Sequence, residues 1–342
     1  MKATRRSNGC WGALVCALLL LLLLGSLLPF FGSGTELVRL RNALLIDELP
    51  AQGGWTPEQP PPDFLWEQLQ APEFFRRQVK SLQLERLPSD WDRAMAIATH
   101  LLTGQPTLLG GPTKADLRST YEAIIGEGKG YCADFTRSYT ALALAAGMPV
   151  RSWAFSFDGY GGHGHVWVEV WLRDRQRWQL LDVYNNYYFT AGGEPLAAME
   201  LRQALLKNDP ALRLHLIAPQ ARPGYADERK AWDYFRRGLP EWYLWWGNNA
   251  FDYDQSKAVR WSSRLGRGLE QLAAIAAGVH PHIRVLPEAD ETRALENMER
   301  LKLWLLAVLV GSPLLAGLTV YAGLRCRRDR RRALAGQAEA AR

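Results

Sequence analysis

One stretch, residues 126–186, constrains the fold of this chain more than any other. It places a glycine-rich turn, a helical pattern and two strand-like runs in direct succession. The helical pattern begins at Cys132, repeats apolar residues at spacings of three and four, and ends at Gly147 and Pro149. A thiol at a helix N-terminus lies at the positive end of the helix dipole, which favours the thiolate. The sequence therefore predicts a helix that presents a nucleophilic cysteine.

The two runs after this helix predict a hairpin. His165 lies on one face of the run HVWVEVWL, and Asp182 lies on one face of the run WQLLDVYNN. A turn centred on Arg173 and Asp174 would put His165 directly opposite Asp182, with Cβ atoms roughly 5 Å apart. A longer loop would make the pair diagonal instead. Either register brings an imidazole next to a carboxylate.

A thiol, an imidazole and a carboxylate in this order can form a nucleophilic triad. At these residues the chain resembles the transglutaminase-like superfamily, whose core is a papain-like cysteine site. GYCADFTRSYTALALAAGMPVR is similar to its nucleophile helix, HVWVEVW to its histidine strand and WQLLDVYNN to its aspartate strand. The resemblance covers about residues 89–200. It implies that Cys132 is the nucleophile, His165 the general base and acid, and Asp182 the group that orients the histidine.

The resemblance also implies an α+β fold, with the nucleophile helix packed on an antiparallel sheet. The family commonly continues its aspartate with Pro-Thr, whereas residues 183–186 read Val-Tyr-Asn-Asn here. This departure leaves the substrate subclass open. His163 is a rival for the histidine role, because it lies two residues before His165 and on the same face if the strand extends that far.

A metal site is the main chemical alternative at these residues. Cys132 with His163 and His165 could bind zinc or copper, but no C-x-x-C or H-E-x-x-H spacing supports it. Asp252 and Asp254 are too few for a calcium loop. We therefore expect neither a metal nor a cofactor.

Charge and apolar runs predict a membrane protein. The formal net charge of +6 comes from the two ends of the chain, so nucleic acid is not an expected partner. Residues 11–31 and 303–324 are apolar and long enough to cross a bilayer, which takes ~20 residues. Basic residues at both chain ends place both termini in the cytoplasm and the body on the extracytoplasmic side of the plasma (inner) membrane. The small residues 32–34 leave a cleaved signal peptide as an alternative for the first span.

The cysteines are unevenly distributed. Cys10, Cys16 and Cys326 lie in or beside the two apolar spans, and Cys132 is alone in the body. We therefore expect no disulfide within the body. A lone cysteine is more often a small buried apolar residue than a nucleophile. The glycine turn, the helix start and the following histidine and aspartate strands favour the nucleophile here.

The segments around the core are less specific. Ser89 is a candidate cap for a helix over residues 91–102, in which His100 is interpreted as a packing or solvent-facing residue. Residues 231–254 are dense in aromatics. They predict either a hydrophobic lid or membrane belt, which we favour, or a stacking surface for sugar rings.

The predicted organisation has seven parts. They are a cytoplasmic N-terminus (1–10), a transmembrane helix (11–31), a linker and helical lead-in (32–88), the transglutaminase-like core (89–200), an aromatic-rich extension (201–302), a transmembrane helix (303–324) and a basic cytoplasmic tail (325–342).

Two classes of function fit this sequence. The first is a membrane-anchored cysteine enzyme that transfers or hydrolyses an amide-linked acyl group of a peptide, surface protein or polysaccharide in the cell envelope. Its oxyanion hole would use the Cys132 amide and a second donor, for which Tyr131 and Tyr121 are candidates. The alternative is a non-catalytic envelope scaffold that binds polysaccharide or an assembly partner through the aromatic segment. A transporter is not expected, because neither span contains a charged residue.

Overall fold

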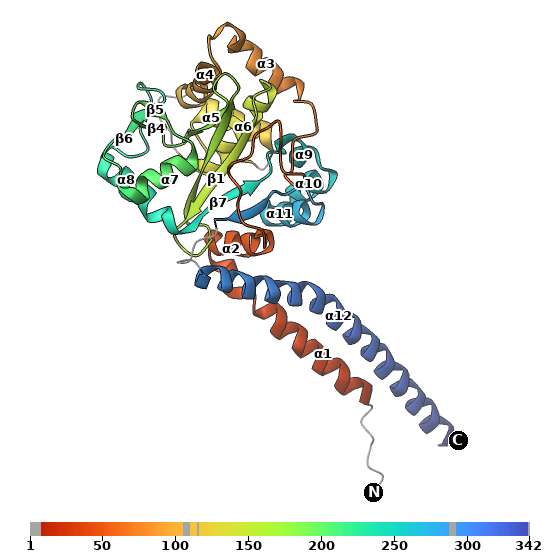
Figure 1. The fold of residues 1–342 in the computed structure, drawn as a ribbon. Coiled ribbons are helices and arrows are strands. Elements are labelled where there is room, and N and C mark those ends of the chain that lie inside the picture. The colour runs from red at the N-terminus through yellow and green to blue at the C-terminus, as the bar shows by residue number, and fades with distance from the viewer. Residues whose placement is uncertain (1–7, 105–109, 115, 287–291, 341–342) are drawn as a thin grey trace. The chain divides into compact units, whose positions relative to one another are not determined.

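The computed structural model describes residues 8–104, 110–114, 116–286 and 292–340 (Figure 1). The chain divides into two compact units. One comprises Leu45–Leu295, and the other combines Met1–Leu44 with Glu296–Arg342. Lys2, Arg5 and Arg6, on which part of the predicted membrane orientation depends, lie outside the described residues.

An antiparallel sheet forms the centre of the unit Leu45–Leu295. Its strand order is β3-β2-β1-β7-β8, so β7 joins the sheet although it follows β1 by some ninety residues in the sequence. Apolar and aromatic residues occupy both faces of the central strands, because helices or further strands cover both sides. The strands are β1 (Val150–Ser156), β2 (Gly164–Leu172), β3 (Arg177–Leu181), β7 (Trp242–Trp246) and β8 (His282–Val285).

Helix α6 (Cys132–Ala145) packs against β1 and β2 on one face of this sheet. Its apolar residues Phe135, Tyr139 and Leu142 are fully buried with Val168 and Val170 of β2. Three further helices surround α6, as Figure 1 shows: α3 (Glu73–Ser81), α4 (Asp90–Thr103) and α5 (Leu117–Glu127). The structure is therefore the mixed helix and antiparallel-sheet fold expected from the sequence.

Helix α4 begins where its cap is predicted. The hydroxyl of Ser89 accepts a hydrogen bond from the amide of Asp92 at 3.1 Å. His100, near the end of the helix, lies 2.7 Å from the Tyr121 hydroxyl through Nε2. His100 is thus a packing residue, as the sequence indicates.

The other face of the main sheet carries a second aromatic core. Its elements include a three-stranded sheet of order β5-β4-β6 and the helices α7 and α8. The bounds are β4 (Tyr187–Ala191), β5 (Glu194–Pro195), α7 (Ala198–Lys207), β6 (Leu212–Leu216) and α8 (Glu228–Gly238).

The aromatic segment 231–254 lies mainly inside the protein. Phe235, Trp242 and Trp246 are at most 2% exposed, and β7 occupies an inner position of the main sheet. The alternative of a sugar-stacking surface on this segment is therefore wrong, because the rings that would stack on a ligand already pack on one another. Short helices complete the unit: η2 (Leu84–Arg86), η3 (Leu239–Glu241), α9 (Ala250–Gln255), α10 (Lys257–Ser262), η4 (Ser263–Leu265) and α11 (Arg267–Ala276).

A buried ion pair in the main sheet also contacts the linker that precedes the transglutaminase-like core. Arg151 and Glu169 face each other across β1 and β2, are at most 2% exposed, and bond through Nε and Oε2 at 2.6 Å. The Glu169 carboxylate also accepts from the Trp153 indole at 2.6 Å. Arg151 donates to the carbonyl of Gly53 at 2.8 Å and lies over the ring of Trp55 at 4.8 Å.

Replacing Glu169 with glutamine should destabilise the protein strongly. The change leaves the Arg151 charge buried without its counter-charge, which typically costs about 3–5 kcal/mol. Equilibrium unfolding followed by tryptophan fluorescence measures this loss. The matched control is Glu200→Gln, because the Arg177–Glu200 pair is solvent-exposed and such pairs contribute at most about 1 kcal/mol. Equal losses in the two variants would contradict the prediction.

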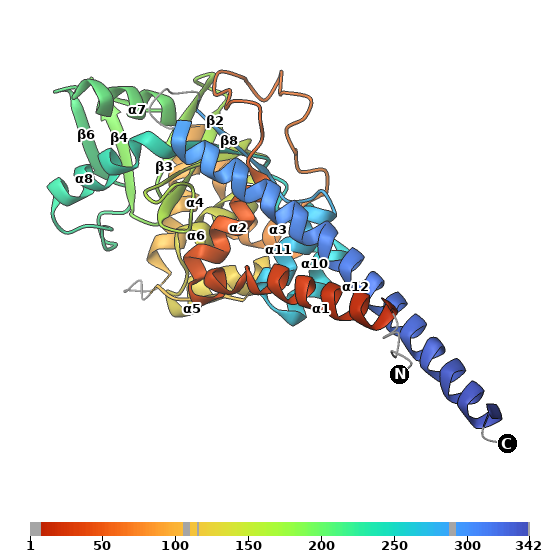
Figure 2. The ribbon, with the colours of Figure 1, turned by 90° about the horizontal axis from the view of Figure 1, so that it is seen from below.

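The second unit is built around two long antiparallel helices, α1 (Asn8–Gly25) and α12 (Thr292–Ala340), which run side by side in Figures 1 and 2. Gly12 faces Ala322, and Gly311 faces Leu23, so small residues let the helices approach closely. The remaining helices of this part of the chain are η1 (Leu28–Gly32) and α2 (Gly34–Leu45).

The same register extends along the whole helix pair. Phe30 stacks on Trp304 with ring centroids 5.6 Å apart, and Cys10 is disulfide-bonded to Cys326. Two segments of this unit, Cys10–Gly32 and Arg293–Ala338, have the length and mean hydropathy of membrane-crossing helices. Length and composition are the only observations that mark them as candidate spans.

Candidate active site

The turn before α6 places Cys132 at the first position of the helix. Gly130 has φ +127°, a value that side-chain-bearing residues rarely adopt, and a Cβ there would crowd Ile124 and Asp134. The Asp134 carboxylate accepts the amide N–H of Tyr131 at 2.9 Å, so the chain is fixed on both sides of the helix start. Cys132 is partly exposed and forms no disulfide. Its amide belongs to the first turn, where helix N–H groups lack an intrahelical acceptor.

His165 and Asp182 lie in direct contact with each other. Nε2 of His165 is 2.8 Å from Oδ2 of Asp182, and both side chains are at most 2% exposed. The thiol of Cys132 is close enough to the imidazole to help raise its pKa. The structure thus brings together the three residues that the sequence singled out. Each comes from a different element: α6, β2 and the end of β3.

The structure distinguishes the two hairpin registers that the sequence left open. Leu172 pairs with Arg177 and Val168 with Leu181, so a four-residue loop joins the strands. Of the two registers that the sequence left open, the structure has the longer loop, and His165 and Asp182 are diagonal neighbours on one face. The pair still meets, because Asp182 lies just beyond β3 and pairs with Tyr187 through two backbone hydrogen bonds of 2.9 Å.

Asn185 is a site residue that the sequence analysis did not identify. Its Nδ2 donates to Oδ2 of Asp182 at 2.8 Å and lies 3.1 Å from Nε2 of His165. Its backbone amide donates to Oδ1 of Asp182 at 3.2 Å. Gly224 lets this arrangement form, because a Cβ there would collide with the Asn185 side chain. The only sequence signal was the Asn-Asn pair in the turn that follows the aspartate.

The groups around His165 favour the protonated form of its imidazole. Burial lowers the pKa of the imidazole, but the charge and hydrogen bond of Asp182 and the contact with Cys132 outweigh it and raise the pKa to about 10. At neutral pH the His165 ring is therefore protonated, with the Asp182 carboxylate and the Cys132 sulfur as its neighbours. Such an arrangement favours a thiolate–imidazolium pair.

Aromatic side chains enclose the imidazole. The ring of Tyr234 meets it edge-on at 5.6 Å, and its hydroxyl donates to the carbonyl of Gly164 at 3.4 Å. Tyr184 lies 6.3 Å away by ring centroids. Burial, and then the nearby charge of Cys132, raise the pKa of both tyrosines, so each stays a neutral hydrogen-bond donor.

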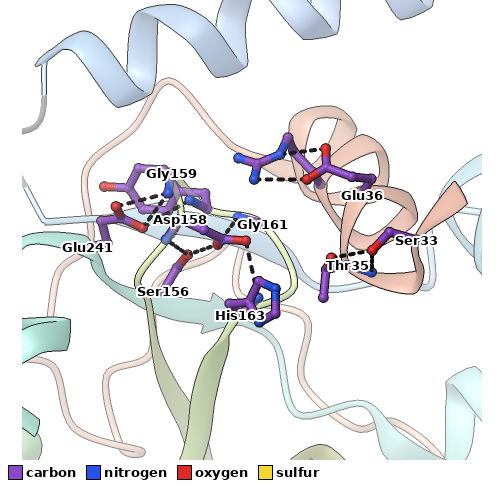
Figure 3. A network of polar contacts seen from close by, with 11 residues as sticks. Ser33, Thr35, Glu36, Ser156, Asp158, Gly159, Gly161, His163 and Glu241 are labelled. Atoms are coloured by element: carbon purple, nitrogen blue, oxygen red, sulfur yellow. Dashed lines mark hydrogen bonds and ion pairs between the residues drawn. The ribbon is translucent and has the colours of Figure 1, made fainter. Parts of the chain in front are cut away.

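The rival histidine is placed elsewhere. His163 precedes β2 and lies in the β1–β2 loop, where its amide donates to Oδ2 of Asp158 at 3.3 Å (Figure 3). The Asp158 carboxylate also accepts hydrogen bonds from the Ser156 hydroxyl and the Gly161 amide. The Glu241 carboxylate accepts one from the Gly159 amide. His163 therefore belongs to a loop network, and His165 is the histidine beside Asp182.

The two proposed oxyanion donors also differ in placement. The hydroxyl of Tyr121 is bonded to His100 and to Gln78 at 3.1 Å, inside the core, so it is committed to other partners. Tyr131 precedes Cys132 and is 52% exposed.

Within the described part of the chain, no group of three or more His, Cys, Asp or Glu side chains could hold a metal ion.

The structure thus has a helix-borne cysteine near a buried His–Asp pair on a mixed helix and antiparallel-sheet scaffold. In the comparison with family models, residues 79–183 match the model of the transglutaminase-like superfamily. The chain thus contains a transglutaminase-like domain, which includes Cys132, His165 and Asp182. The superfamily generally consists of cysteine enzymes, although some members are inactive. Comparison with curated proteins and with solved structures finds no match.

Proposed function

We propose that this protein is a membrane-anchored, extracytoplasmic cysteine enzyme that transfers or hydrolyses an amide-linked acyl group through a thioester. One observation carries the proposal. The His165 imidazole lies 2.8 Å from the Asp182 carboxylate and near the thiol of Cys132, which begins helix α6. A nucleophile, a proton carrier and an orienting carboxylate are the groups that this chemistry needs.

The reaction would begin with attack of the Cys132 sulfur on the substrate carbonyl carbon, forming a carbon–sulfur bond and an oxyanion. The backbone N–H of Cys132, at the positive end of α6, would stabilise that oxyanion. The carbon–nitrogen bond then breaks as His165 gives its proton to the leaving amine. A thioester and a neutral imidazole remain.

The second half reverses these roles. The neutral His165 takes a proton from water or from an acceptor amine, whose oxygen or nitrogen attacks the thioester carbon. The carbon–sulfur bond breaks and regenerates the Cys132 thiolate beside the imidazolium. Asp182 and Asn185 touch no reacting atom in this scheme, and their role is to orient and charge-balance the imidazole.

The proposed location rests on the two candidate spans and on the basic residues at the chain ends. It gives peptides, surface proteins or amide-bearing polysaccharides of the envelope as the substrate class. The non-catalytic alternative relied on an exposed aromatic segment. Because its large rings are largely buried in the core, no observation now favours the alternative.

Alkylation of Cys132 tests the proposal directly. Replacing Cys10, Cys16 and Cys326 with alanine leaves Cys132 as the sole thiol for iodoacetamide. We expect Cys132 to be alkylated at pH 6 at least about tenfold faster than free cysteine, because an adjacent protonated imidazole activates a thiol. His165→Ala should slow alkylation at pH 6 by at least about tenfold.

The control is the same titration on free cysteine, whose alkylation increases steeply between pH 6 and pH 8. A Cys132 rate that follows the free amino acid, whether or not His165 is present, would refute the activated pair. A slow rate at every pH would do the same.

A further inference from the structure

Helices α10 and α11 carry a line of exposed apolar side chains. Trp261, Leu265, Leu269 and Leu272 are 67%, 58%, 50% and 44% exposed. They follow one another at spacings of four, four and three residues, and α10, η4 and α11 pack together. Leu269 and Leu272 lie on one face of α11, and Trp261 and Leu265 lie on α10 and η4, which pack against α11. We call these four exposed side chains the apolar ridge.

The exposure of the ridge follows from how these helices are packed. Helix α11 turns Glu270 and Ala274 inward, and α10 turns Val259 and Ser262 inward. The core thus takes the opposite face of each helix. Single exposed leucines are ordinary on protein surfaces, but a tryptophan and three leucines in a row are typical of a binding face.

The residues around the ridge are basic. Lys257, Arg260, Arg264 and Arg267 are exposed beside it. Residues 257–279 contain one acidic residue, Glu270. Its side chain is buried, and its carboxylate accepts a hydrogen bond from the Tyr253 hydroxyl at 2.9 Å. Arg267 also lies 3.4 Å from the Asp134 carboxylate through its guanidinium. The described residues of α10, η4 and α11 therefore combine exposed apolar and cationic side chains, and their one acidic side chain is buried.

This combination fits an anionic bilayer. Amphipathic helices with Trp and Leu on one face and Lys and Arg beside it lie in the lipid interface. Tryptophan prefers the headgroup level, and basic side chains are attracted to anionic lipids. The chain also carries two helices with the length and hydropathy of membrane spans, which would keep a bilayer within reach.

We propose that the apolar ridge and its basic rim form a docking surface for anionic phospholipid. The ridge inserts at the headgroup level, and the basic side chains bind lipid phosphates. The proposal concerns α10 and α11 alone. It does not depend on the chemistry proposed for Cys132, and the test uses a protein without that thiol.

The test places one fluorophore beside the ridge in the full chain. All four native cysteines are replaced by alanine, and Ala276→Cys carries an environment-sensitive NBD label one turn after Leu272, leaving the ridge intact. The protein is reconstituted in nanodiscs of phosphatidylcholine with or without 30% phosphatidylglycerol, both containing a headgroup-proximal doxyl lipid. The matched control is Leu206→Cys, at a 45% exposed leucine of α7.

We expect the label at position 276 to be quenched at least twofold more than the label at 206 in discs with phosphatidylglycerol. The excess should fall toward the control in 0.5 M salt, in discs without phosphatidylglycerol, and in the Lys257→Gln/Arg260→Gln/Arg264→Gln variant. The double variant Trp261→Gln/Leu269→Gln should remove the excess quenching at position 276 in discs of either lipid composition.

Two outcomes would overturn the proposal. Equal quenching at positions 276 and 206 would show that no lipid reaches the ridge. A label at 276 that is shielded from aqueous iodide but not quenched by doxyl lipid would indicate a protein partner or a second copy of the chain instead.

Discussion

Replacing Cys132 with alanine should abolish turnover of an amide substrate, with a loss on the order of 10⁴- to 10⁶-fold in kcat. The sulfur forms the covalent bond of the proposed intermediate, and no other side chain beside His165 can replace it in that role. The assay uses a glutamine-containing peptide amide with hydroxylamine as acceptor and measures acyl-hydroxamate by mass spectrometry.

The matched control for this loss is Cys16→Ala, which removes the other unpaired thiol while leaving the site intact. It should retain the wild-type rate. Near-ultraviolet circular dichroism should be the same in both variants, because Cys132 is partly exposed and its removal leaves no large cavity. Cys132→Ala with activity within a few-fold of wild type would contradict the covalent mechanism.

Replacing Asp182 with asparagine should lower kcat by about 10³- to 10⁴-fold, as loss of the orienting carboxylate does in a nucleophilic triad. The physical reason is the charge of His165. Without the carboxylate, burial is opposed only by the contact with Cys132, so the pKa of the imidazole should fall from about 10. ¹⁵N NMR of the labelled imidazole measures this fall as a shift of its titration to lower pH.

The same shift predicts a pH dependence of stability. The pKa of His165 in the folded protein lies above the unfolded value of 6.5, so its pairing stabilises the fold fully below pH 6.5 and is lost as the pH rises through about 10. The free energy of unfolding of the wild type should therefore decrease between these pH values. Asp182→Asn should not show this decrease, and parallel profiles for the two proteins would rule out the raised pKa.

Asn185→Ala provides a graded comparison. It removes one donor to Oδ2 of Asp182 but keeps the carboxylate, so a smaller loss in kcat and a smaller fall in the His165 pKa should follow. The control is Asn186→Gly, because the amide of Asn186 bonds the carbonyl of Ala218 and its φ of 65° suits glycine. This control should lower stability while leaving the His165 pKa unchanged.

The sequence by itself was enough for the local parts of the site. The glycine turn and the spacing of three and four fix a helix that starts at Cys132, because such signals act through neighbouring residues. The alternation of HVWVEVWL and WQLLDVYNN likewise determines which side chains share a face with His165 and Asp182. The sequence also determined which two segments have the length of a membrane span.

Only the tertiary structure decided the rest. The hairpin register depends on a four-residue loop, and a change in loop length moves a pair from opposite to diagonal without altering its face. The role of Asn185 depends on Gly224, nearly forty residues away, and the burial of Trp242 and Trp246 depends on β7 joining β1. These contacts are set by packing between distant segments, and a single sequence carries no local signal for such packing.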